Sequence, residues 1–527
     1  MKALFFAVAV SLPLAAQVPY ERILRARSEP GNWLTYHGSY DGRRHSALDQ
    51  INTTNVRRLK PDWAYQIGTR HKLETTPLVV DGIMYLSEPP SDVTALDTRT
   101  GRPLWKYTRT VPEDVRVCCG QVNRGVALLD DLVFVGTVEA HLVALDALTG
   151  IVRWDTQVAD YKLGYSITPA PLAVKNIVIA GMGGGEYGVR GFLDAYDAKT
   201  GKQVWRLSTI PGPGEPGNET WAGDSWKAGS ATTWMTGSYD PELNLLYWGT
   251  GNPGPDWNGD VRPGDNLFSD CLLALNADTG KVKWYFQFTP HDVYDWDAAQ
   301  VPVLIDAMIR GRQRKLVLFA NRNGFYYVLD RESGEFLAGR QLVYQTWAKG
   351  LDDKGRPVRL PNSFPSAEGT VVYPRSEGET NWFSPSYSPQ TNLFYVAVRE
   401  NEGGILYIGE PEYKPGTMFI GGGYHNIPGE LPYGAIRALE PTTGEVRWEF
   451  RLFSPPWQGV LSTGGGLVFG GTNEGDFFAL DAKTGESLWH FQTGATVWGN
   501  PMSYMSDGKQ HVAIASGAAI FDFALGE

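Results

Sequence analysis

A short phrase that recurs along the chain limits what this protein can fold into. It runs from a small residue through Leu or Tyr and Asp or a relative to Thr-Gly, and a Trp follows four residues after the glycine. A seventh, incomplete copy around Gly334 has Ala338 in place of the Trp. The six full copies end in the pairs Gly101–Trp105, Gly150–Trp154, Gly201–Trp205, Gly280–Trp284, Gly444–Trp448 and Gly485–Trp489. Asp and Gly are typical of a tight turn, and the residues on either side are typical of strands.

Each copy therefore marks one unit of a repeat, and the spacing is typical of a four-stranded propeller blade of about 40 to 50 residues. The gap between Gly334 and Gly444 is long enough for two blades, so we place an unmarked blade around residues 380–398. The sequence then predicts an all-β, eight-bladed β-propeller with tryptophan-docking repeats. It occupies residues 17–527 as a single domain, and the 61 Gly and 34 Pro suit its many turns.

Two regions lengthen the loops of this propeller. A Gly- and Pro-rich segment, roughly residues 211–265, is expected to be an insertion that covers one end of the molecule. The loops near Trp257 and from residues 413 to 425 are expected to form the mouth of a funnel.

The N-terminus has the pattern of an export signal. Lys2 precedes an apolar run from Ala3 to Ala16, with small residues before Gln17. The alternative is a membrane anchor, but the run is shorter than the roughly 20 residues that a spanning helix needs. We therefore predict a signal peptide at residues 1–16, a periplasmic mature protein and no membrane span.

The formal net charge of the chain is −11. Neither a basic stripe nor a nucleic-acid-binding module is present, which argues against DNA or RNA as a partner. An acidic surface favours a basic protein partner, although only weakly and at low salt.

The chain has three cysteines, and two of them are adjacent. In an oxidising compartment Cys118 and Cys119 tend to pair, although α-carbons about 3.8 Å apart strain such a ring. Two buried, unbonded thiols remain the alternative. Cys271 is expected to be a buried core residue. Since no Cys-x-x-Cys-His motif is present, we expect no covalent haem, and any electrons must leave on a separate carrier.

Between the repeats lie short polar and Gly-rich segments that propeller blades do not need. They are residues 73–77, 118–125, 183–191, 249–253, 262–266, 289–292 and 295–297. Together and in this order they resemble the pyrroloquinoline-quinone (PQQ) dependent, or quinoprotein, alcohol dehydrogenases of the methanol and ethanol dehydrogenase type. The resemblance covers essentially the whole mature chain, and its most specific parts are the paired cysteines, Gly-Asn-Pro at 251–253 and Pro-His-Asp at 290–292.

Three of these segments supply oxygen donors, namely Glu186, Asn252 and Asp295. Two carboxylates and an amide suit a hard cation, whereas zinc or copper would draw His or Cys. Each residue alone could equally cap a turn or lie in solvent. The resemblance implies that Glu186 and Asn252 bind a metal ion that also contacts the quinone.

The resemblance also implies how the cofactor is held. A Cys118–Cys119 disulfide would stack on one face of the flat ring and Trp234 on the other. The remaining positions that match the family's cofactor contacts are Glu74, Arg124, Thr168, Gly183, Gly184, Gly185, Thr232, Arg322, Asn381 and Trp457. The alternatives are ordinary ones: surface ion pairs for the two arginines, and packing between blades for the two tryptophans.

By the same resemblance, Asp295 is the catalytic base and Arg322 lies beside the reactive carbonyl. Asp295 would take the hydroxyl proton of a primary alcohol while a hydride passes to the quinone, which gives an aldehyde. Electrons would then pass to a soluble cytochrome c. A homodimer is left open.

The choice of metal depends on Asp297. Family members that use a lanthanide carry Asp two positions after the base, and calcium-dependent members usually carry a small or uncharged residue. In an extended segment residues 295 and 297 point to the same side. With Glu186 they would place three carboxylates near one cation, which suits a trivalent ion. We therefore predict a lanthanide, with Ca²⁺ as the alternative if Asp297 faces solvent.

The chain departs from the family pattern at a few positions. Gly183 replaces a common Ser, and Asn321 replaces a common Asp. Residues 516–521 replace a C-terminal Gly-Gly-Trp pattern, which puts a cofactor contact and the closing of the last blade in doubt. Two other functions are kept in view: a propeller scaffold of the outer-membrane assembly type that binds no cofactor, and a calcium-dependent enzyme acting on another alcohol, a sugar or an aldehyde.

Overall fold

The fold was obtained as a computed structural model that describes residues 18–69 and 71–526. The predicted signal peptide at residues 1–16 lies outside these residues. Helices are few and short: α1 (Tyr20–Leu24), η1 (Ala26–Ser28), η2 (Val56–Arg58), η3 (Tyr161–Leu163), η4 (Gly185–Tyr187), η5 (Asn218–Thr220), η6 (Ser225–Ala228), η7 (Gly259–Val261) and η8 (Pro361–Ser363). In the described part of the chain, no helix has the length and apolar character needed to span a bilayer.

The structure is built from eight sheets of four or five strands, with two smaller sheets attached. The first four sheets contain β3 (Leu78–Val80), β4 (Ile83–Glu88), β5 (Asp92–Asp97) and β6 (Pro103–Tyr107); β7 (Ala127–Leu129), β8 (Leu132–Gly136), β9 (His141–Asp146) and β10 (Val152–Gln157); β11 (Leu172–Val174), β12 (Ile177–Gly181), β13 (Phe192–Asp197) and β14 (Gln203–Ser208); and β15 (Ser238–Asp240), β16 (Leu245–Gly249), β17 (Cys271–Asn276) and β18 (Val282–Gln287).

The other four large sheets complete the series. They contain β19 (Val303–Ile309), β20 (Arg312–Ala320), β21 (Phe325–Asp330) and β22 (Phe336–Gln341); β26 (Ser386–Ser388), β27 (Leu393–Glu400), β30 (Tyr433–Leu439) and β31 (Val446–Leu452); β1 (His45–Ser46), β32 (Leu461–Thr463), β33 (Leu467–Gly471), β34 (Asp476–Asp481) and β35 (Ser487–Gln492); and β2 (Leu59–Gln66), β38 (Ala519–Leu525), β37 (Lys509–Ser516) and β36 (Met502–Ser506).

The repeat tryptophans join neighbouring sheets. Trp105 donates its indole N–H to the carbonyl of Ala147 in the next sheet at 3.0 Å, and Trp154 does the same to Ala198 at 2.9 Å. A Cβ at Gly150 would lie 2.5 Å from the Trp105 ring, so the turn glycine is needed for this close approach. The same bond recurs at Trp205–Ala277, Trp284–Arg331 and Trp448–Ala482.

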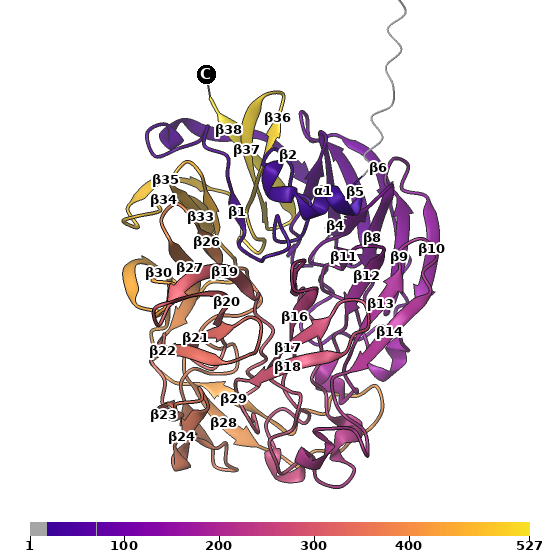
Figure 1. The fold of residues 1–527 in the computed structure, drawn as a ribbon, viewed down its shortest axis with the longest axis vertical. Coiled ribbons are helices and arrows are strands. Elements are labelled where there is room, and N and C mark those ends of the chain that lie inside the picture. Colours follow the sequence, from indigo (N-terminus) through magenta and orange to yellow (C-terminus); the bar gives the residue numbers. More distant parts are fainter. Residues whose placement is uncertain (1–17, 70, 527) are drawn as a thin grey trace, which may run out of the picture.

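The two ends of the chain close the ring of sheets. Strand β2 pairs with β38 along its whole length, so the N-terminal strand completes the C-terminal sheet. Figure 1 shows β2 in indigo beside β37 and β38 in yellow. Trp489 donates to Leu59 of this sheet at 3.0 Å, and Trp63 in β2 donates to Thr98 of the first sheet at 2.9 Å. The doubt about the closing of the last blade is therefore removed.

Eight sheets match the predicted number of blades, but the placement of the unmarked blade was wrong. Strands β26 and β27, near residues 380–398, belong to the same sheet as β30 and β31, which flank Gly444. The extra length before Gly444 forms the small sheets instead: β23 (Ala348–Leu351) with β24 (Pro357–Arg359), and β25 (Thr370–Val372) with β28 (Gly404–Ile408) and β29 (Gly422–Asn426). The unmarked blade is the one that contains Trp63.

The incomplete repeat at Ala338 is explained by another aromatic residue. At the other turn glycines a Trp lies against the glycine, whereas Gly444 lies against the ring of Tyr326. The Tyr326 hydroxyl donates to the Pro441 carbonyl at 2.7 Å and so replaces the indole bond.

The segment 211–265 is not one insertion. Its middle contains β15 and β16, which pair with each other, and β16 also pairs with β17. Two loops remain, one on each side of this hairpin, and they carry η5, η6 and η7. The many Gly and Pro residues hid two short, fully buried strands. Cys271 begins β17 and is buried, as predicted.

Candidate active site

All the residues predicted to act at the site line one cavity of about 250 Å³. They come from loops of sheets that are far apart in the sequence. The set is Glu74, Cys118, Cys119, Arg124, Thr168, Gly183, Gly184, Gly185, Glu186, Thr232, Trp234, Asn252, Asp295, Asp297, Arg322, Asn381 and Trp457.

Glu186 lies in η4, a single turn of 3₁₀ helix between β12 and β13. Gly184 precedes this turn with a φ of 112°, and a Cβ there would collide with the Gly164 carbonyl. Only glycine fits this close approach. The Glu186 carbonyl accepts the Phe419 N–H at 2.6 Å, so the loop from residues 413 to 425 holds the turn from outside.

Asp295 and Asp297 lie in the segment between β18 and β19. The buried Asp292 carboxylate accepts the N–H groups of Tyr294 and Trp296 at 3.0 and 2.9 Å, which folds the segment back on itself. Asp295 has a φ of 64°, an unfavourable value for a residue with a Cβ. The segment is therefore not extended as expected, yet both carboxylates line the cavity.

Asp297 connects the neighbouring groups. Its Oδ1 accepts the Asn252 N–H at 2.9 Å, and its Oδ2 forms an ion pair with Arg322. A Cβ at Gly251 would lie 2.5 Å from Asp297 Oδ1, so glycine is required beside Asn252. Arg322 Nη2 also lies 3.7 Å from Asp295 Oδ2. Since Asp297 is only 6% exposed, the alternative that it faces solvent is excluded.

The orientation of the Asn252 amide is set by Asp256, a buried residue that the sequence did not single out. Asn252 Nδ2 donates to Asp256 Oδ1 at 3.0 Å and to the Pro253 carbonyl at 3.4 Å. The amide oxygen of Asn252 is thus left for the cavity.

The site carries more negative than positive charge. Burial raises the pKa of Glu186 to about 7, and the Asp297 carboxylate adds to this shift. Burial also raises the pKa of Asp295 well above its ordinary value, although the Arg322 guanidinium opposes the change. Buried carboxylates that share one guanidinium are costly, and a cation among them would relieve that cost.

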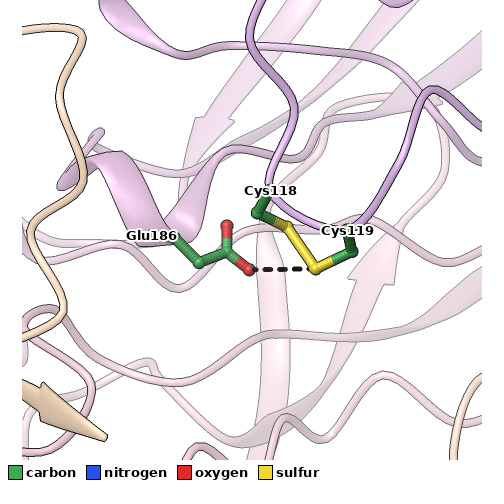
Figure 2. Close-up of side chains that lie close together, drawn as sticks. All are labelled: Cys118, Cys119 and Glu186. Carbon is green, nitrogen blue, oxygen red and sulfur yellow. Dashed lines mark hydrogen bonds between the residues drawn. A yellow bond between two sulfur atoms is a disulfide. The ribbon is translucent and has the colours of Figure 1, made fainter.

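Cys118 and Cys119 are joined by a disulfide, which removes the alternative of two free thiols. Figure 2 shows the Glu186 carboxylate pointing toward it, with Glu186 Oε1 at 3.9 Å from Cys119 Sγ. The disulfide therefore lies beside the Glu186 carboxylate.

Arg124, another residue of the cavity wall, is held by Glu74 and Thr168. Its Nη2 lies 2.7 Å from Glu74 Oε2, and its Nη1 donates to Thr168 Oγ1 at 3.0 Å. The guanidinium also lies over the rings of Trp234 and Trp382, at 5.1 and 4.8 Å. Because Arg124 is 6% exposed, it is not a surface ion-pair partner.

Several other residues line the cavity, and no role was predicted for them: Lys72, Val117, Gly120, Val122, Ser166, Tyr187, Ser376, Glu377 and Trp382. Ser166 bears on one departure from the family pattern. Its Oγ lies 3.1 Å from the place where a Cβ of Gly183 would be, so a hydroxyl is present beside that position. Ser166 stands two residues before Thr168, which was the only signal for it.

Comparison with known proteins shows which family the chain belongs to. A family model described as glucose/ethanol/alcohol dehydrogenase, beta-propeller domain, matches residues 33–341 and 430–512. The quinoprotein alcohol dehydrogenase PedH of Pseudomonas putida is 43% identical over 530 residues, which cover 95% of this chain and 89% of PedH. The chain belongs to the PQQ-dependent quinoprotein alcohol dehydrogenase family.

Other quinoprotein dehydrogenases are similar over nearly the same length. The lanthanide-dependent methanol dehydrogenase of Methylacidiphilum fumariolicum is 38% identical, over 94% of this chain and 86% of that protein. The structure of the quinohemoprotein alcohol dehydrogenase from Comamonas testosteroni has a TM-score of 0.90 at 36% identity, over 97% of this chain and 83% of that one. A europium-containing methanol dehydrogenase has a TM-score of 0.89 at 33% identity, over 96% and 100%.

The residues of this quinoprotein dehydrogenase fit the groups that the family implies. Three carboxylates and an amide oxygen line the same cavity, and these are the groups that would hold a hard cation. The disulfide and the rings of Trp234 and Trp457 supply apolar surfaces for a flat ring, and Arg124 supplies a cation for its carboxylates.

Proposed function

We propose that this eight-bladed quinoprotein oxidises primary alcohols to aldehydes with PQQ and a bound lanthanide ion. The observation that carries the proposal is the convergence of Glu186, Asn252, Asp295 and Asp297 on one cavity beside Arg322. The family relationship supports the reaction class, and the names of two relatives, a lanthanide-dependent and a europium-containing methanol dehydrogenase, support the metal.

The third carboxylate favours a trivalent ion over Ca²⁺. Glu186, Asp295 and Asp297 together carry three negative charges when ionised, and Arg322 returns one positive charge. The net charge of −2 on these four groups alone matches a divalent ion, and the carboxylates of bound PQQ would add the further negative charge that favours a trivalent ion. Calcium remains the alternative metal and is tested directly below.

We assign each of these residues a role from its position in the cavity and from its contacts. Glu186, Asn252 and Asp297 would hold the metal, and Asp295 would take the proton of the substrate hydroxyl. A bound cation and Arg322 both favour the ionised form of Asp295, which a base requires. Arg322 also fixes Asp297 through their ion pair. When bound, PQQ supplies the hydride acceptor.

The test uses protein freed of metal, incubated with PQQ and either LaCl₃ or CaCl₂. Turnover of ethanol is followed with an artificial electron acceptor. We expect La³⁺ to support turnover and Ca²⁺ to support at most a few per cent of it. Full turnover with Ca²⁺ alone would contradict the lanthanide assignment, and absence of the bound-quinone absorbance with either metal would contradict the enzyme itself.

We further propose a periplasmic location and a soluble cytochrome c as electron acceptor. The export-signal pattern of residues 1–16 and the disulfide between Cys118 and Cys119 support an oxidising compartment. Cell fractionation and the mass of the mature protein test this, with an N-terminus at Gln17 as the expected result. A cytoplasmic protein that keeps Met1 would contradict it.

A further inference from the structure

Glu377 is a charged residue of the cavity wall for which the proposed mechanism has no use. It lines the same cavity as Asp295 and Arg322, and its side chain is 18% exposed. Desolvating a carboxylate, even in part, is costly unless partners offset the cost. Its surroundings indicate what it binds.

The Glu377 carboxylate is held by Arg375 and Tyr424. Arg375 Nε lies 2.7 Å from Glu377 Oε2, and the hydroxyl of Tyr424 in β29 donates to Oε1 at 2.7 Å. Arg375 is fixed in turn by Glu402 at 2.6 Å and by Asn426 Oδ1 at 2.7 Å. The small sheet that contains β29 thus places an anchored carboxylate in the cavity wall.

The residue before Glu377 contacts Arg322, one of the groups assigned to the reaction. Arg322 Nε donates to the Ser376 carbonyl at 3.1 Å, and Arg322 Nη2 lies 3.7 Å from Asp295 Oδ2. Contacts therefore lead from the proposed base to Arg322 and from Arg322 to Ser376, the residue next to Glu377. A substrate whose hydroxyl lies at Asp295 has its remaining atoms in the same cavity as Glu377.

The carboxylate is ionised and keeps capacity to accept. Burial would raise the pKa of Glu377, but Arg375, Arg399 and the Tyr424 hydroxyl outweigh burial and hold it below the ordinary value. Burial and the Glu377 carboxylate raise the pKa of Tyr424 to about 12, so Tyr424 remains a donor. A carboxylate has about four acceptor positions. Arg375, Tyr424 and the Ser376 hydroxyl at 3.2 Å occupy three of them.

We propose that Glu377 is a specificity-determining residue that selects alcohols bearing a second hydroxyl group, such as diols and polyols. This inference rests on the proposed dehydrogenase function. An apolar substrate displaces water from the carboxylate and returns no hydrogen bond, whereas a second hydroxyl donates one. The difference between the two substrates is a hydrogen bond to a charged, partly buried acceptor.

The experiment compares two substrates with the same number of non-hydrogen atoms, 1,3-propanediol and 1-butanol. The ratio of their kcat/KM values is measured with the PQQ- and lanthanide-loaded enzyme and with Glu377→Leu. We expect the native ratio to favour the diol and to fall about tenfold or more in the variant. Because both substrates are measured on one preparation, loss of active enzyme cancels in the ratio.

Further variants separate binding from folding. Glu377→Gln keeps the shape and an acceptor oxygen, so we expect an intermediate ratio, and it replaces Glu377→Leu if that variant does not fold. Tyr424→Phe should lower the ratio less, because the carboxylate stays. Glu412→Gln removes an exposed carboxyl and should leave the ratio at the native value. The absorbance of the bound quinone reports whether the site is intact.

The outcomes distinguish this inference from the proposed function. If neither alcohol is oxidised with PQQ under any metal, the proposed function fails. If both are oxidised and Glu377→Leu leaves the ratio unchanged, only the inference about Glu377 fails. If 3-amino-1-propanol is preferred over the diol and Glu377→Gln abolishes that preference, the residue selects ammonium groups and the hydroxyl assignment is overturned.

Discussion

At the scale of single residues, Asp297 would set how much negative charge a bound cation has to balance. It bonds to the Asn252 N–H and pairs with Arg322, so its carboxylate is fixed within the donor set. We expect Asp297→Ala to weaken La³⁺ binding at least about 100-fold, the upper end of the loss seen when even an outer partner of a metal ligand is removed. Calorimetric titration of the metal-free protein with LaCl₃ in the presence of PQQ measures this.

The surface variant Asp260→Ala serves as the control, since it removes an exposed carboxyl from a nearby loop. Equal La³⁺ affinity for the native protein and Asp297→Ala would remove the charge argument for a trivalent ion.

We expect Asp256 to affect metal binding through Asn252. It accepts the Asn252 amide N–H at 3.0 Å and so directs the amide oxygen to the cavity. Without it the amide can rotate, and we expect Asp256→Ala to weaken La³⁺ binding about 10- to 100-fold. The same titration measures the loss, again with Asp260→Ala as the control. An unchanged affinity would mean that Asn252 needs no such partner.

Many of the predicted site residues could be found because they lie in a motif that survives as a short run, such as Gly251-Asn252-Pro253. Ser166, Asp256 and Glu377 were missed although each stands two to four residues from a predicted position, Thr168, Asn252 and Asn381 respectively. Their importance comes from contacts with residues that are distant in sequence, such as Ser166 with Gly183 and Glu377 with Tyr424. The unfavourable φ of Asp295 was equally invisible, because it follows from the fold of the segment after Asp292.

At the scale of elements, strand β2 supplies the tryptophan that an eighth copy of the repeat would supply. Trp63 in β2 donates to Thr98 and lies against Gly101, as the repeat tryptophans do with later sheets. Burying an indole contributes roughly 3 to 5 kcal/mol where it is fully buried, so half-buried Trp63 should contribute about 2 to 3 kcal/mol.

We therefore expect Trp63→Ala to lower the melting temperature of the protein by several degrees in calorimetry. Phe453→Ala, which removes a ring that is 86% exposed, should leave it nearly unchanged. Equal effects of the two substitutions would mean that Trp63 does not help to close the ring.

The turn motif identified most elements because Asp, Thr and Gly make the same turn in each sheet. The motif could not locate a sheet that has no such turn. The closing sheet has none of its own, and its Trp63 stands far from its partners β36 to β38 in the sequence. The missing Trp at 338 likewise gave no sign that Tyr326 would replace it, because the two positions lie on different strands.

At the scale of the whole molecule, the site connects separate sheets. Glu186 follows β12, Asn252 follows β16, and Asp297 lies between β18 and β19, so one ion would join loops of two successive sheets and the segment that leads to the next. A ligand that binds only the folded state at 100 times its Kd adds about 2.7 kcal/mol of stability. We expect PQQ with La³⁺ to raise the melting temperature, and chelation to reverse the rise.

That stabilisation should depend on the donor set. Asp297→Ala should lose most of the rise in melting temperature, whereas Asp260→Ala should keep it. A rise of the same size in Asp297→Ala would place the ion elsewhere in the molecule.

The most direct test is anomalous X-ray diffraction from crystals of the protein reconstituted with PQQ and a lanthanide. The account predicts one strong anomalous peak in the cavity, within coordination distance of oxygens from Glu186, Asn252, Asp295 and Asp297. A cavity without a peak, or a peak that Asp297 does not contact, would contradict it.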